Sequence, residues 1–262
     1  MNNEKHHLLI SGAAARLHET DPGIGFAIAR LAARRGHRVS IVDVSSNGLR
    51  GAKAALGGEG LACDLAVADV SDSEAVEAAV QRLGAERAIT AVVNSAALLR
   101  SDRAFSPFDS MDAAEIRAAV GVNVLGVLNT VRAALPKMLA RGSGVVVNIG
   151  SISAAHPASG LATYAMTKAA VRSVTGTLGA ELGRRGIHVQ GLAPGIVRTG
   201  LHDLTPARYR ASLVDQSVLG EPAAPERIAA AVLEVVESPN PLQVGHMVAL
   251  DGGLSPYGVL PR

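Results

Sequence analysis

The chain has 262 residues, with 25 Lys and Arg against 23 Asp and Glu, and a formal net charge of +2. So small a charge, without a basic cluster, excludes the surfaces with which proteins bind nucleic acid or an anionic membrane. The single cysteine, Cys63, excludes an internal disulfide and fits a reducing compartment. We identify no apolar run as long as a membrane span and no signal peptide, so we expect a soluble cytoplasmic protein.

The first predicted unit is a strand at residues 8–10, a turn that carries Gly12 and Gly23, and a helix at residues 26–35. Strand, glycine-bearing turn and helix form the phosphate-binding half of a dinucleotide fold. The glycines let the backbone approach a pyrophosphate at the positive N-terminus of the helix. We therefore expect a dinucleotide to bind at this turn.

The turn is longer than this motif needs, because ten residues separate its two glycines, where a tight loop would use about three. We interpret the extra segment either as a solvated surface insertion or as a flap that brings Arg16 to the cofactor phosphates. In both cases we expect residues 16–22 to lie on the cofactor side of the site and not in the substrate pocket. Thr20 or Asp21 is expected to cap the helix, with Pro22 in its first turn.

The second predicted strand, residues 39–42, ends at Asp43. A carboxylate in this position accepts hydrogen bonds from the adenosine ribose hydroxyls and repels a 2′-phosphate. No arginine follows it directly, so the pattern favours NAD over NADP. The alternative interpretation is that Asp43 only caps the helix that follows.

Strands and helices alternate through the rest of the chain, without repeats or an internal linker. We predict helices at residues 48–56, 73–83 (capped by Ser71 or Asp72), 113–141, 164–185 and 225–238, and strands at 65–68, 89–93, 145–149, 187–192 and 246–250. This alternation predicts an α/β fold in which residues 1–262 form a single domain around one doubly wound parallel sheet of about seven strands.

Three other segments suggest parts of a site. The small residues at 94–97, which begin with Asn94, suit a place where the backbone passes close to a flat ligand. Asn123 lies among apolar residues of its helix, where a buried amide needs partners, so it either bends the helix or holds water and backbone near the site. Residues 200–220 have weak periodicity, as a mobile segment covering the substrate would have. We also consider Ser153, His156 and Leu161 as candidates for lining the substrate pocket.

Lys168 follows Tyr164 by four residues, so the two side chains stack on one face of their predicted helix. A tyrosine titrates near ~10, too high for a general base at neutral pH. An ammonium roughly 4–5 Å away, at an effective dielectric constant of about 20, would stabilise the phenolate by ~4 kcal/mol and lower its pKa by about two to three units. Ser151 follows a predicted strand at the sheet edge where chemistry gathers in open α/β sheets. The alternative is a surface helix with an incidental Tyr/Lys pair.

Taken together, these residues resemble the short-chain dehydrogenase/reductase family from the first strand to residues 251–253. The motifs that carry the resemblance are Gly23-Ile24-Gly25, Asp69-Val70, NSAA at 94–97, Asn123, Ser151, Tyr164 with Lys168, and Pro194-Gly195 with Thr199. Two departures matter. The extra loop interrupts the glycine-rich turn and puts phosphate contacts of residues 13–16 in doubt. NSAA replaces the family's NNAG, so the resemblance gives only weak support for assigning the family's roles at these positions to Ser95 and Ala97.

The resemblance implies a Rossmann-like fold, no metal site, and a role for each matching residue. Tyr164 is implied as the acid/base and Ser151 as the group that hydrogen-bonds the substrate oxygen. Lys168 would lower the tyrosine pKa and bind the nicotinamide ribose, and Asn123 would support the lysine through a water. The implied cofactor-binding residues are Gly12, Gly23, Ile24, Asp43, Asp69, Val70, Asn94, Ala96, Tyr164, Lys168, Pro194, Val197 and Thr199.

The expected function is an NAD(H)-dependent oxidoreductase that interconverts a secondary alcohol and a ketone by hydride transfer. The alternatives are an NADP-linked ketoreductase of an acyl or polyketide-type biosynthetic substrate, and a non-catalytic cofactor-binding protein. Small residues along 113–141 and 171–182 leave helix faces without bulk, and the family pairs these helices across a two-fold axis. We therefore expect a homo-oligomer, and specifically a tetramer.

Overall fold

The computed structural model describes residues 5–14, 23–99, 105–156, 158–200 and 205–254. In these residues seven strands form one sheet in the order β3-β2-β1-β4-β5-β6-β7, and every neighbouring pair is parallel. The strands are β1 (His7–Ser11), β2 (Arg38–Asp43), β3 (Asp64–Val67), β4 (Ala91–Asn94), β5 (Gly144–Ile149), β6 (Ile187–Pro194) and β7 (Met247–Leu250). This confirms the predicted single parallel sheet.

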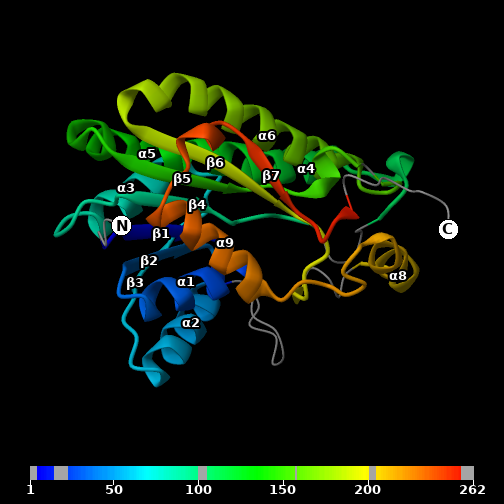
Figure 1. Cartoon of the computed structure of the whole chain (residues 1–262), viewed down its shortest axis with the longest axis horizontal. Coiled ribbons are helices and arrows are strands. Elements are labelled where there is room, and N and C mark those ends of the chain that lie inside the picture. Colours follow the sequence, from blue (N-terminus) through cyan, green and yellow to red (C-terminus); the bar gives the residue numbers. More distant parts are fainter. Residues whose placement is uncertain (1–4, 15–22, 100–104, 157, 201–204, 255–262) are drawn as a thin grey trace.

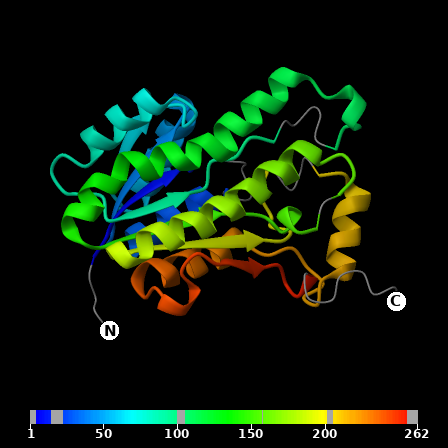
Figure 2. The same ribbon diagram turned by 90° about the horizontal axis from the view of Figure 1, so that it is seen from above.

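Helices cover both faces of the sheet (Figure 1). They are α1 (Ile24–Arg34), α2 (Ser46–Gly58), α3 (Ser73–Leu83), α4 (Ala113–Val120), α5 (Gly126–Arg141), α6 (Ala162–Leu182), α8 (Ala207–Gln216) and α9 (Pro225–Glu237). Helices α1, α2 and α9 pack on one face, and α3, α5 and α6 on the other. Helix α8 lies beyond the carboxyl ends of the strands, as both overall views show (Figures 1 and 2).

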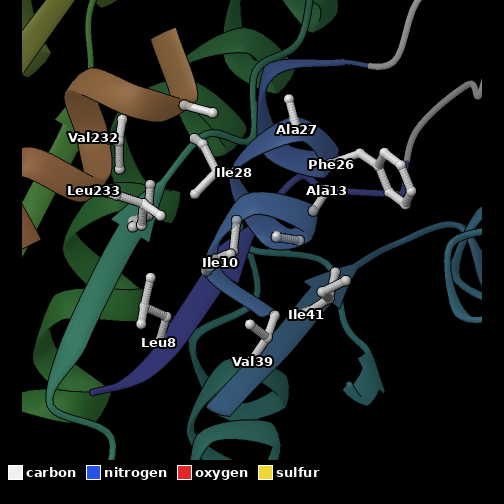
Figure 3. Close-up of a cluster of buried hydrophobic side chains, with 14 of the residues drawn as sticks. Leu8, Ile10, Ala13, Phe26, Ala27, Ile28, Val39, Ile41, Val232 and Leu233 are labelled. Atoms are coloured by element: carbon white, nitrogen blue, oxygen red, sulfur yellow. The ribbon is translucent and has the colours of Figure 1, made fainter. Parts of the chain in front are cut away.

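Alternation along the strands divides the core between the two faces. In β1, Leu8 and Ile10 belong to the cluster under α1 and α9, whereas Leu9 belongs to the cluster under α3 and α5. Figure 3 shows the first cluster, with Ile28 of α1 and Leu233 of α9 directed toward the β1 side chains. Burying an aliphatic side chain of this size contributes about 1.5–3 kcal/mol, so the strands are anchored on both sides.

The strand order reverses beside β1, and this places a crevice at the carboxyl edge of the sheet. The chain runs outward from β1 to β2 and β3, then returns to place β4 on the other side of β1. Loops that leave β1 and β4 therefore diverge, and ligands of open α/β sheets bind in the gap between them.

Two of the predicted helix caps are wrong and one is confirmed. Helix α1 begins at Ile24, its N-cap is Gly23, and no side chain caps it. Thr20, Asp21 and Pro22 lie outside the described residues, and the N-cap position itself is occupied by Gly23 and not by Thr20 or Asp21. Helix α2 is capped by the Ser45 hydroxyl and not by Asp43. Asp72 caps α3 as expected, accepting hydrogen bonds from the amides of residues 74 and 75.

The predicted helix at 113–141 is continuous but contains a π-helical turn, η2 (Gly121–Leu125), between α4 and α5. By length and composition Ala113–Arg141 is apolar enough to cross a membrane, with a mean hydropathy of 1.5 in its most apolar window. Within the window, 39% of the residues are buried, and the helix contacts α3 and α6. One helix of this kind is weak evidence of a membrane span. Core helices of soluble proteins have the same composition.

The segment at 200–220 contains helix α8, which its weak periodicity did not predict. None of the residues of α8 is buried. A helix that buries no side chain needs no regular apolar stripe, so its sequence carries little periodic signal.

Candidate active site

A cavity of about 940 Å³ lies along the carboxyl edge of the sheet. Its lining includes most of the predicted site residues: Gly12, Gly23, Ile24, Asp43, Asp69, Val70, Ala96, Ser151, Ser153, Leu161, Tyr164, Lys168, Pro194, Val197 and Thr199. Asn94, Asn123 and His156 do not line it. The predicted loop at 16–22, with Arg16, lies outside the described residues.

The floor of the cavity is a close crossing of three backbone segments. Gly12 has a φ of +74°, and a Cβ added there would lie 2.3 Å from the Cα of Ala96. A Cβ on Gly25 would lie 2.4 Å from the carbonyl oxygen of Gly12. Only glycine fits either position, and the backbone thereby forms a shallow cradle at the N-terminus of α1. A helix N-terminus without a side-chain cap suits a pyrophosphate, so this part of the site fits a dinucleotide.

Asp43 holds two segments of this cradle together. Its Oδ2 accepts a hydrogen bond from the amide of Ala14 at 3.1 Å, and its Oδ1 accepts one from the amide of Ser45 at 2.9 Å. A Cβ on Gly48 would lie 2.1 Å from the carbonyl oxygen of Ala14, so the start of α2 packs tightly on the same residue. Each carboxylate oxygen still has acceptor capacity on the cavity side.

The adenine end of the expected cofactor site is set by helix α5. A Cβ on Gly126 would lie 2.6 Å from Cγ2 of Val70, and Asn129 donates a hydrogen bond to the Val70 carbonyl at 2.9 Å. Asp69 accepts hydrogen bonds from the amide and hydroxyl of Ser71. Sequence reasoning missed Gly126 and Asn129, because nothing local shows that α5 crosses this loop.

Ser151 and Tyr164 both line the cavity, and the two side chains interact. The amide of Ser153 donates to Oγ of Ser151 at 3.1 Å. The Ser151 hydroxyl also interacts with the Tyr164 phenol, and this interaction favours the phenolate. Burial raises the pKa of Tyr164 to about 12, and the hydrogen bond with Ser151 offsets only part of this shift. The phenol is therefore protonated at neutral pH.

Lys168 lies beside this pair, with Nζ 5.7 Å from the centre of the Tyr164 ring. Its ammonium donates to the carbonyl of Ile149 at 2.9 Å, and burial lowers its pKa to about 8. The expected net lowering of the Tyr164 pKa by this lysine is wrong for this structure. Desolvation raises the pKa of the phenol and lowers that of the ammonium, although Tyr164 is only partly buried and lines the cavity.

Asn123 and Asn94 serve the framework of the site and not its surface. The Asn123 amide accepts from the Leu98 amide at 2.6 Å and donates to the Leu98 carbonyl and to Oγ1 of Thr167. It thus ties the loop after β4 to α6, and its link to Lys168 through a water stays a prediction. Asn94 bonds Asn148 of β5 and Thr130 of α5, which turns its amide away from the cavity.

His156 and the aromatic residues correct the expected substrate pocket. His156 is exposed and does not line the cavity. Phe105 does line it, with a ring centroid 5.0 Å from that of Tyr209 on α8. The chain has only three Phe and three Tyr, and three of these six line one cavity. Sequence reasoning missed Phe105 and Tyr209, and this scarcity is the signal that could have found them. Other lining residues that sequence reasoning did not single out are Leu98, Leu99, Arg117, Ile196 and Leu213.

Comparison with known proteins identifies the family. A family model described as enoyl-(acyl carrier protein) reductase matches residues 19–255. Galactitol 2-dehydrogenase (L-tagatose-forming) of Cereibacter sphaeroides is 34% identical over 250 residues, which cover 93% of this chain and 95% of that protein. A gluconate 5-dehydrogenase from Burkholderia cenocepacia J2315, in complex with NADP and tartrate, superposes with a TM-score of 0.85 at 30% identity, covering 96% of this chain and 95% of that one.

A 3-oxoacyl-[acyl-carrier protein] reductase from Brucella melitensis with bound NAD gives a TM-score of 0.84 at 29% identity, covering 96% of this chain and 92% of that one. These proteins are named dehydrogenases and reductases, and the two crystal structures hold a nicotinamide dinucleotide. The chain therefore belongs to the short-chain dehydrogenase/reductase family of nicotinamide-dinucleotide-dependent oxidoreductases.

Proposed function

We propose that this oxidoreductase interconverts a secondary alcohol and a ketone, with Tyr164 as its acid/base and NAD(H) as its preferred cofactor. The observation that carries the proposal is the chain from the Ser153 amide through Ser151 to Tyr164, beside the Lys168 ammonium and inside the cavity. A phenol in the cavity, a hydroxyl that interacts with it and an adjacent cation are the parts that proton transfer requires.

The cavity supplies groups for each part of the cofactor. The turn at Gly12 and Gly23–Ile24 would hold the pyrophosphate, Asp43 the adenosine ribose, and Asp69 with Val70 the adenine. Lys168 would bind the nicotinamide ribose, and Pro194, Val197 and Thr199 would hold the carboxamide. When bound, the nicotinamide supplies or accepts the hydride. Asp43 favours NAD, because a buried carboxylate at the ribose repels a 2′-phosphate.

The chain's own residues supply the proton. In ketone reduction, Ser151 donates a hydrogen bond to the substrate oxygen, and Tyr164 gives its phenolic proton to that oxygen as negative charge develops. The pKa of about 12 keeps this proton in place at neutral pH. In alcohol oxidation, Tyr164 acts as a phenolate, and the Lys168 ammonium stabilises it electrostatically. Asn123 is a positioning residue, because its amide fixes Leu98 and Thr167 around this group.

Helix α8 forms the cover of the site in this proposal. Tyr209 and Leu213 stand four residues apart on α8 and both line the cavity. They therefore share one helix face, directed toward the substrate position. The covering role expected of the segment at 200–220 is part of this proposal, and these two lining residues support it.

Tyr164→Phe tests the acid/base assignment. The variant keeps the ring and removes the proton, so the dissociation constant of the dinucleotide should change little while kcat falls by ~10²–10⁴. The assay follows NADH absorbance in both directions with a panel of secondary alcohols and ketones. Retention of more than about a tenth of wild-type kcat would contradict the assignment. A wild-type protein that binds the dinucleotide but turns over no substrate would favour a non-catalytic cofactor-binding protein.

A further inference from the structure

The cavity has a polar end and an apolar end. Asp43 ends β2 and Asp69 follows β3, on one side of the sheet, whereas Ser151 follows β5 and Pro194 ends β6 on the other. Arg117 belongs with the first end, because it precedes Gly121 by one helical turn and a Cβ on Gly121 would lie 3.3 Å from Ser71. Asp43, Asp69 and Arg117, three charged residues that line the cavity, thus lie at the cofactor end.

The opposite end, around Ser151 and Tyr164, is walled by hydrocarbon. Its lining includes Leu99, Phe105, Ile152, Leu161, Tyr209 and Leu213. Among the described residues that line the main cavity at this end, Lys168 is the only one with a formal charge, and its ammonium is already bonded to the Ile149 carbonyl. The remaining polar side chains here are hydroxyls, such as those of Ser151 and Ser153.

This wall is held in place and is not a loose loop surface. Phe105 has a φ of 67°, a left-handed conformation that costs a non-glycine residue on the order of 1–3 kcal/mol. A Cβ on Gly160 would lie 2.6 Å from the Phe105 backbone, so only glycine admits this approach. On its other side Phe105 packs on the Tyr209 ring at an interplanar angle of 58°. Packing on both sides holds an aromatic ring over the site.

The apolar end continues into a side cavity of about 60 Å³ that Tyr164 and Leu161 also line. Its other walls include Met111, Ile116 and Ala119, with Glu115 and Thr163 as polar members. The volume is about twice the share of one water in the liquid, roughly 30 Å³. It offers room for a small substituent next to the acid/base.

We propose that the substrate is a secondary alcohol or ketone with apolar, uncharged substituents, aliphatic or alicyclic, and not a polyol or a sugar acid. This rests on the function proposed above. Polyol hydroxyls buried against this wall would lose water and gain only the few hydroxyl partners named above, and a carboxylate would meet, among the described residues at this end, only the Lys168 ammonium that already donates to Ile149. An apolar chain instead gains affinity from each methylene that it buries.

A homologous series tests the proposal by kinetics. With NAD as oxidant, kcat/KM should rise about fourfold per added methylene from 2-butanol to 2-hexanol, from the ~0.8 kcal/mol of a buried CH₂. Galactitol and gluconate serve as the polar comparison and should be at least about a hundredfold poorer than 2-hexanol. Faster turnover of galactitol or gluconate than of 2-hexanol would overturn the substrate class while leaving the proposed oxidoreductase chemistry intact.

Matched variants on α8 test whether the dependence of kcat/KM on alcohol chain length arises at the cavity-facing side of this helix. Leu213 lines the cavity and Val214, its half-buried neighbour, does not. Leu213→Ala should lower kcat/KM for 2-octanol about tenfold, and that for 2-butanol less, with the dinucleotide dissociation constant unchanged. Val214→Ala should stay within about twofold of wild type for both alcohols. Equal effects of the two variants would contradict an apolar substrate wall on this face.

A calorimetric titration of 2-octanol into Tyr164→Phe with NAD present gives a readout that needs no turnover. Burial of apolar surface should give a negative heat-capacity change between about 10 and 35 °C. Galactitol should give no binding heat. If wild type oxidises none of the alcohols, the proposed function fails and this titration still decides the substrate class. Binding of galactitol in preference to 2-octanol would reject it.

Discussion

Asp43→Ala removes the one carboxylate that connects the β1 loop, at Ala14, to the start of α2, at Ser45. The Ala14 amide is buried and would keep no acceptor, a cost of about 1–3 kcal/mol. The Ser45 amide is only partly buried, so water can replace the lost carboxylate, and the loss of this hydrogen bond costs about 0.5–1.5 kcal/mol. We therefore expect the free energy of unfolding to fall by ~2–4 kcal/mol.

The same change should alter cofactor choice through a separate effect. Removing a negative charge from the ribose position relieves repulsion of a 2′-phosphate by on the order of 1–2 kcal/mol at an effective dielectric constant of 20 or more. The ratio of kcat/KM for NAD to that for NADP should fall about 5- to 30-fold, from a wild-type value that favours NAD.

Val44→Arg is the matched control for Asp43→Ala. Val44 is exposed and lines the cavity beside Asp43, so the new cation should improve NADP use while the two hydrogen bonds remain. Urea unfolding without cofactor and initial rates with both dinucleotides measure the two effects. Wild-type stability of Asp43→Ala would refute the hydrogen-bond reasoning. A wild type that prefers NADP would refute the role of Asp43 in cofactor choice.

Three further predictions concern pH, assembly and the β1 loop. Without cofactor, stability should rise from pH 8 to about 10, because the folded state holds Lys168 at a pKa of about 8 and the unfolded chain near 10.5. Above about pH 10 the free energy of unfolding should fall, since the folded state keeps the Tyr164 proton to about pH 12. The rise between pH 8 and 10 amounts to about 3 kcal/mol, and Lys168→Met should abolish it. Light scattering at micromolar concentration should give a homo-oligomeric mass, because Leu125, Leu128 and Met166 leave apolar surface exposed on η2, α5 and α6; a monomer would contradict this. Replacing residues 16–22 with a short glycine-containing turn should change KM for the dinucleotide more than KM for the substrate; the reverse result would place the loop on the wrong side of the site.

The helices and strands were predictable from the sequence because they depend on local periodicity. The common position of the site residues was predictable because it depends on where the strands end. Asp43, Ser151 and Pro194 lie far apart in the chain, yet each lies at or just past the carboxyl end of a parallel strand, and such ends share one edge. The pKa of Tyr164 was not predictable in this way. Spacing gives the distance to Lys168, but burial of both groups depends on the whole fold and reverses the sign of the shift.

Residues that act across the fold were also beyond sequence reasoning. Asn123 was expected at the lysine, and the structure places its amide on Leu98 and Thr167. Nothing in the local pattern shows that a π-helical turn faces the loop after β4. The same holds for Phe105, whose neighbours Gly160 and Tyr209 come from two later segments.

Two sides of the substrate end, the loop at Leu98 and the pair of Phe105 with helix α8, are connected to the proton-transfer residues in different ways. This difference bears on how the enzyme can change its substrate. The Leu98 side is hydrogen-bonded through Asn123 to Thr167, which lies between Tyr164 and Lys168 in α6. A substitution that moves the Leu98 side therefore also moves Tyr164, the proposed acid/base. Among the described residues, α8 meets the Phe105 side of the site through ring packing, which tolerates exchange of one apolar shape for another. Selection for a new substrate can therefore rework α8 without disturbing the chemistry, while the Asn123 side stays under constraint.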